Sequence, residues 1–83
     1  MISKTEAIAL RHGDIIYDAQ YHNADGSPCR WYVTGKIKLW KTRSNDFRLP
    51  LKHGMYDYGE LTQRNNARFH TTEESALTNK CWK

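Results

Sequence analysis

The residues of this chain whose types and spacing point to chemistry are basic and aromatic ones near its middle. Residues 36–43 read KIKLWKTR and place four basic side chains around a tryptophan. Lysine and arginine bind phosphate groups, and a tryptophan ring is a flat surface on which a nucleic-acid base can stack. The wider set of candidate binding residues is Arg30, Tyr32, Lys36, Lys38, Trp40, Lys41, Arg43, Arg48 and Lys52.

The net charge of +4 arises from the same central block. Residues 30–54 carry seven bases and one acid, residues 1–29 carry two bases and four acids, and residues 55–83 carry four of each. Such a block creates a positive potential that attracts phosphates or an acidic protein surface, and salt weakens it. We therefore expect non-enzymatic nucleic-acid binding, without base specificity. The alternative is a protein-interaction module with Trp40 as its hot spot.

A third interpretation is that these side chains only form a solvated face, since lysines on exposed strands also oppose edge-to-edge aggregation. Enzyme signatures are missing from the sequence: it contains neither GxxxxGK[ST] nor GxGxxG, and no histidine stands at zinc-ligand spacing from a cysteine. Arg30 would favour a reactive thiolate at Cys29, but the position of Cys29 on an apolar strand face indicates a core residue. We expect no enzymatic activity, no metal and no cofactor.

The element that must position the candidate residues is a strand predicted over residues 29–40. Apolar and polar positions alternate there for twelve residues, which places the odd positions in the core and the even positions in solvent. Gly35 is where such a strand would bend so that the sheet curls. The expected core positions are Cys29, Trp31, Val33, Ile37 and Leu39.

A second strand is predicted before it, over residues 14–22. The apolar odd positions Ile15, Tyr17, Ala19 and Tyr21 are expected to face the core, with Ile16 as the exception to the pattern. Asp14 and Asp18 are interpreted as part of a solvated strand face. The segment NADGSP then supplies the turn of a hairpin, with Gly26 at positive φ.

The remaining segments predict short elements. Residues 3–11 fit either a helix that opens with a Ser3–Glu6 capping box or a brief strand over residues 8–10. Residues 46–51 predict a strand with Phe47, Leu49 and Leu51 inward, which lies at an edge or ends at Pro50.

Turns are expected around residues 55–58, followed by a helical turn capped by Thr62 and a strand that buries Phe69. Residues 71–83 fit a weak helix or a flexible tail.

About five short strands predict one domain over residues 1–83, all-β or β-rich α+β. An SH3-like barrel is the favoured architecture and a curled antiparallel sheet the alternative. No apolar run approaches membrane-spanning length, so we expect a cytoplasmic protein. Two cysteines, Cys29 and Cys81, do not make a disulfide framework, and their pairing is left open.

The succession LRHGD, NADGSP, GKIKLWKTR and FRLPLKHGMYDYG resembles short uncharacterised bacteriophage proteins over residues 10–70. The resemblance transfers no activity, because none of these motifs has a known chemical role. It implies expression in the cytoplasm of an infected bacterium. There the partner would be nucleic acid or a host protein such as a polymerase, nuclease or defence factor.

Overall fold

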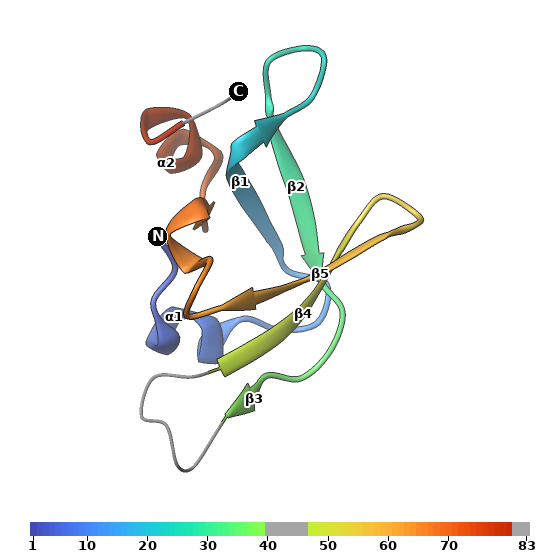
Figure 1. Ribbon diagram of the computed structural model, residues 1–83, viewed down its shortest axis with the longest axis vertical. Helices are drawn as coiled ribbons and strands as arrows, with labels where there is room; N and C mark the ends of the chain where they lie inside the picture. The colour runs from blue at the N-terminus through green and yellow to red at the C-terminus, as the bar shows by residue number, and fades with distance from the viewer. Residues whose placement is uncertain (40–46, 81–83) are drawn as a thin grey trace.

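The computed structural model describes residues 1–39 and 47–80. Within them, six strands form an open antiparallel sheet in the order β3-β4-β2-β1-β6, and β5 pairs with β4 (Figure 1). This confirms the predicted small β-rich fold in the form of a curled sheet. The strands are β1 (Ile15–His22), β2 (Pro28–Val33), β3 (Lys38–Leu39), β4 (Phe47–His53), β5 (Asp57–Thr62) and β6 (Phe69–His70), and the helices are α1 (Lys4–Ala9), the 3-10 helix η1 (Asn66–Arg68) and α2 (Glu73–Thr78).

The hydrophobic core lies on one side of this sheet, which we call the inner side. Alternate residues of β4 fill it, namely Phe47, Leu49 and Leu51, as their spacing predicts. Leu61 of β5 and Phe69 of β6 pack into the same cluster. Fully burying one such side chain contributes about 1.5–3 kcal/mol, so the inner face of β4 is a main source of stability.

The N-terminal segment closes one side of the core. Its helix is α1, which settles the alternative between helix and strand that the sequence leaves open. The capping box is present, because Glu6 N–H donates to Ser3 Oγ at 3.2 Å and Ser3 N–H donates to Glu6 Oε1 at 3.1 Å. Both Ile2 and Ala7 are fully buried, so this short helix is held by packing as well as by its cap.

The predicted inner face of β1 is wrong for its first half. Ile16 and Asp18 are fully buried, whereas Ile15 is exposed and Tyr17 is only half-buried. The pairing of β1 with β2 shifts register between Tyr17 and His22, so Asp18 and Ala19 are buried in succession. An irregularity of this kind inverts the alternation that a strand otherwise keeps. Tyr21, beyond it, is 51% exposed.

The predicted strand over residues 29–40 divides in two. β2 ends at Val33 and β3 begins at Lys38, and both pair with β4. Cys29 and Val33 are buried as predicted, but Leu39 is 49% exposed. The reason is that β3 is two residues long and ends the strand order, so β4 alone lies beside it.

Pro50 explains where the interruption lies, and it corrects a second prediction. β4 is an interior strand that continues past Pro50, rather than an edge strand that ends there. Thr34 N–H donates to Pro50 C=O at 3.0 Å, so the backbone of Pro50 points toward residues 34–37. The gap between β2 and β3 lies on the same side of β4, where an N–H of residue 50 would otherwise donate a hydrogen bond to the neighbouring strand. Proline has no N–H, so that hydrogen bond cannot form.

The predicted turn at Gly26 and the C-terminal predictions agree with the structure in outline, but residues 57–62 form β5 where turns were expected around residues 55–58. Gly26 has φ +87° in the β1–β2 turn. The helical turn is η1, which begins at Asn66, three residues after the start expected from a cap at Thr62. Phe69 is buried in β6. α2 packs against β1 and β6 with Ala76 buried, so residues 73–78 adopt the helical alternative. Among the described residues, no helix is long and apolar enough to cross a membrane.

Candidate functional site

The outer side of the sheet, opposite the core, brings several of the predicted binding residues together. Tyr32 of β2 lies directly opposite Lys52 of β4, and Lys38 of β3 lies opposite Arg48 of β4. Side chains that face each other across an antiparallel pair stand on the same side of the sheet, about 4.5–5.5 Å apart at Cβ. Arg30 is two positions before Tyr32 and is exposed on the same side. We name this set, Arg30, Tyr32, Lys38, Arg48 and Lys52, the basic strand face.

The charges of the basic strand face are partly balanced by β5. Arg48 lies 3.9 Å from the Glu60 carboxylate, an ion pair in which both side chains are about half exposed. Lys52 Nζ lies over the Tyr58 ring, 5.6 Å from its centroid. An exposed ion pair of this kind contributes at most about 1 kcal/mol, so the contact with Glu60 opposes phosphate binding by Arg48 only weakly.

The other predicted site residues are not part of this face. Lys36 lies in the interruption between β2 and β3, where with Ile8, Leu10 and Arg11 it lines a separate depression beside α1. Trp40, Lys41 and Arg43 lie outside the described residues. The basic strand face therefore consists of five of the nine predicted residues.

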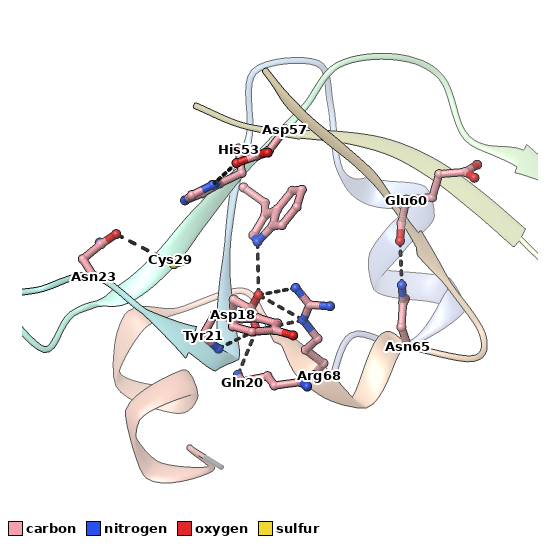
Figure 2. A network of polar contacts seen from close by, with 11 residues as sticks. Asp18, Gln20, Tyr21, Asn23, Cys29, His53, Asp57, Glu60, Asn65 and Arg68 are labelled. Carbon is pink, nitrogen blue, oxygen red and sulfur yellow. Dashed lines mark hydrogen bonds and ion pairs between the residues drawn. The ribbon is translucent and has the colours of Figure 1, made fainter. Parts of the chain in front are cut away.

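On the inner side, a buried carboxylate organises a second group of residues that the sequence did not single out. Asp18 is fully buried, which corrects its interpretation as part of a solvated strand face. Its oxygens accept hydrogen bonds from Gln20 N–H at 2.8 Å, Tyr21 N–H at 3.3 Å and Trp31 Nε1–H at 3.2 Å. Arg68 Nε donates to both oxygens at 2.9 Å, and its Nη2 donates to Oδ2. Figure 2 shows Arg68 directed at the Asp18 carboxylate.

Aromatic rings surround this ion pair. The Arg68 guanidinium lies 4.8 Å from the centroid of the Tyr21 ring, 4.9 Å from that of Phe69 and 5.8 Å from that of Trp31. The Trp31 ring lies 5.3 Å from His53, whose Nδ1 is 3.4 Å from Asp57 Oδ2. Cation–π contacts of a desolvated guanidinium reach about 2 kcal/mol, so Arg68 is fixed by its rings as well as by Asp18.

Gly59 allows Trp31 to take this position. A Cβ atom on Gly59 would lie 3.1 Å from Trp31 Cζ3 and 3.4 Å from its Cη2. The indole therefore packs on bare backbone of β5, and any other residue would displace it.

A hollow of about 400 Å³ opens beside these residues, between the β1–β2 and β4–β5 hairpins. Its walls include Tyr21 and Tyr58, which are 51% and 71% exposed. We name this space the inner hollow, defined by Asp18, Tyr21, Cys29, Trp31, Tyr58 and Arg68. Tyr58 joins it to the basic strand face, because the same residue pairs with Lys52 across β4 and β5.

Burial controls the protonation of two groups close to the core. Cys29 is buried as predicted, and desolvation, followed by the negative charge of Asp18, raises the pKa of its thiol, with Arg68 as a smaller opposing influence. The thiol form, a poor nucleophile, is therefore favoured. Desolvation, followed by the charge of the N-terminal ammonium group, lowers the pKa of His70.

Within residues 1–39 and 47–80, no group of three or more His, Cys, Asp or Glu side chains is placed to hold a metal ion. The sequence contained one signal for the inner hollow. Ile16 is the apolar exception among the even positions of β1, and Asp18, two residues later on the same side of the strand, is buried with it. No protein-family model matches the chain, and neither curated proteins nor solved structures give a match.

Proposed function

We propose that this chain is a small, non-enzymatic nucleic-acid-binding protein whose basic strand face engages a phosphate backbone. The observation that carries the proposal is the pairing register of β4 with β2 and β3, which puts Lys38 beside Arg48 and Lys52 beside Tyr32. Cations arranged along a strand can follow successive phosphates, and Tyr32 adds a ring for stacking.

The resemblance to short bacteriophage proteins supports a phage origin and action in the bacterial cytoplasm as part of the same proposal. The same proposal includes an SH3-like arrangement of the strands. The meander β1-β2-β4-β5, followed by η1 and by a last strand that returns to β1, supports it.

The test is fluorescence anisotropy with random single- and double-stranded oligonucleotides at low salt. We expect binding that weakens when Lys38, Arg48 and Lys52 are replaced by alanine. Lys80→Ala is the matched control, because Lys80 follows α2, at the opposite end of the strand order from β3. No binding of the unaltered protein at low salt would rule the proposal out.

A protein-interaction function is the second candidate, and the tip of the β4–β5 hairpin favours it. Met55 and Tyr56 are 74% and 85% exposed there. Large exposed apolar side chains at one place are typical of protein contacts. A pull-down from bacterial lysate with and without nuclease separates the candidates. A partner that survives nuclease and is lost in Met55→Ser with Tyr56→Ser supports this second function.

A further inference from the structure

We infer that the inner hollow is a pocket for one unpaired base of a nucleic-acid strand whose phosphates lie on the basic strand face. This inference rests on the proposed function and adds to it a preference for single strands. The sequence prediction assigned stacking to the outer rings, whereas the hollow lies on the inner side of the sheet.

The shape and lining of the hollow fit a flat ring. Tyr21 of the β1–β2 hairpin and Tyr58 of the β4–β5 hairpin both line the space and are both exposed, with Tyr58 at the border toward the outer side, where it lies opposite Lys52. Trp31, held by its hydrogen bond to Asp18 and by Gly59, is a fixed part of the lining. Rings placed in advance lose little conformational freedom on binding, which favours stacking of a planar ligand.

The charges beside the hollow argue against an ionic ligand. Arg68 already lies over the Tyr21 and Trp31 rings, where an incoming cation would have to sit, and its own charge would repel that cation. An anion would meet the Asp18 carboxylate, which is fully buried and already neutralises Arg68. Asp57, which also lines the hollow, lies 3.4 Å from His53 Nδ1, so a neutral planar group fits this lining best.

Arg68 also supplies polar recognition. Its Nε and Nη2 donate to Asp18, and a guanidinium has five N–H donors. Among the described residues, Nη1 makes no hydrogen bond to a protein group, so it can donate to a carbonyl oxygen of a base. The aromatic walls with one fixed donor are the combination that small-molecule sites use to orient a ligand.

The hollow and the basic strand face are close enough to serve one strand. Lys52 belongs to that face, and its ammonium lies 5.6 Å from the ring centroid of Tyr58, which lines the hollow. A phosphate held by Lys52 therefore leaves its base next to the Tyr58 ring. In a duplex that base is paired and stacked, and extracting it costs a few kcal/mol. Duplex DNA is then bound through phosphates alone.

The first experiment compares a ten-residue oligothymidylate with an abasic strand of the same length and charge. We expect the oligothymidylate to bind about tenfold more tightly, since stacking one base is worth about 1–3 kcal/mol. Tyr21→Leu reduces its affinity to the abasic level and leaves abasic binding unchanged, because Tyr21 is not on the basic strand face. Tyr21→Phe keeps the ring and the affinity. Thermal unfolding of each variant checks the fold, and Tyr58→Leu replaces Tyr21→Leu if the latter unfolds.

The second experiment follows the indole N–H signal of Trp31 by NMR, with Trp40→Phe and Trp82→Phe used for assignment. Thymidine monophosphate moves the signal, and deoxyribose 5-phosphate, which lacks the base, leaves it in place. Equal binding of oligothymidylate and abasic strand, with no response of Trp31, overturns the base pocket and leaves the proposed function standing. If no oligonucleotide binds at low salt, the proposed function fails and the base pocket fails with it, even if the mononucleotide moves the signal.

Discussion

The Asp18 side chain is fully buried, so its partners decide whether a carboxylate charge is tolerated there. Five N–H donors surround its carboxylate: two backbone amides, the Trp31 indole, and Nε and Nη2 of Arg68. Removing one member of a buried ion pair leaves the other uncompensated and costs about 3–5 kcal/mol. We therefore expect Asp18→Asn to lower the free energy of unfolding by about 3 kcal/mol or more, measured by urea denaturation.

The control for this prediction is Glu60→Gln, which removes the acid of the exposed Arg48–Glu60 pair. Exposed pairs contribute at most about 1 kcal/mol, so the urea midpoint should move little. The double change Asp18→Leu with Arg68→Leu should recover part of the loss, because no buried charge is then left alone. Equal effects of Asp18→Asn and Glu60→Gln would contradict the assigned role of Asp18.

His70 gives the molecule a dependence on pH with a definite sign. Its Nδ1 lies 2.9 Å from the Met1 ammonium nitrogen and 2.8 Å from the Ser75 hydroxyl oxygen, and because an ammonium group can only donate, the first contact suits an unprotonated Nδ1 and so the neutral ring. Because the pKa of His70 is lowered in the folded protein, the unfolded chain takes up the proton first as the pH falls below 6.5. The stability contributed by neutral His70 is thus present above pH 6.5 and is lost below it.

We expect the Tm to fall by a few degrees between pH 7.5 and 5.5, since about 1 kcal/mol shifts the Tm of a domain this size by roughly 4–8 °C. His70→Asn retains an acceptor near the Nδ1 position and cannot titrate, so its Tm should vary less over this range. His12→Asn, a change at an exposed histidine, should behave like the unaltered protein. A Tm profile of His70→Asn as steep as that of the unaltered protein would exclude His70 as the source.

Among the strands, β5 shows how one missing side chain positions a distant ring. In Gly59→Ala the new Cβ would approach Trp31 Cζ3 to 3.1 Å, so the indole must move to make room for it. Overpacking of this kind costs about 1–3 kcal/mol. We expect a lower urea midpoint and a displaced indole N–H signal of Trp31. Glu60→Ala, on the outer side of the same strand, should leave the signal in place.

The elements could be predicted where the information is local. The capping box of α1 and the turn at Gly26 each need only a few neighbouring residues, and the alternation in β4 is regular. The division of residues 29–40 was not predictable from their own pattern, because its cause is Pro50 in another strand. Asp18 was missed for the same reason. A charged residue is counted as exposed unless its partner is known, and Arg68 is 50 residues away in sequence.

In the whole molecule, the basic residues and the hydrophobic core lie on opposite sides of the sheet, so the binding surface can be altered with little effect on stability. Lys38, Arg48 and Lys52 are on the outer side, and the core cluster lies on the inner side. Each phosphate contact contributes about 0.7 to the slope of log Kobs against log salt for a single strand, so replacing all three by alanine should lower that slope by about 2. Binding titrations at salt concentrations of roughly 25 to 200 mM measure this slope.

Lys80→Ala should leave the slope unchanged, and the Tm of the triple variant should stay close to that of the unaltered protein, since surface substitutions usually change stability by less than about 0.5 kcal/mol. A triple variant that unfolds would mean that these side chains hold the sheet together. A slope that does not change would place the phosphate contacts elsewhere.

The contact between Asp18 and Arg68 also has a consequence for kinetics. It joins residues 50 positions apart, and β6 pairs with β1, so we expect this contact to form after the more local hairpins between them. Closing so long a loop is entropically costly, and non-local pairing of this type slows folding to the millisecond-to-second range. An interaction that forms after the rate-limiting barrier changes the unfolding rate and leaves the folding rate nearly unchanged. In stopped-flow chevron plots, Asp18→Asn should therefore accelerate unfolding and leave the refolding limb nearly unchanged, so that Asp18 determines how long each molecule stays folded.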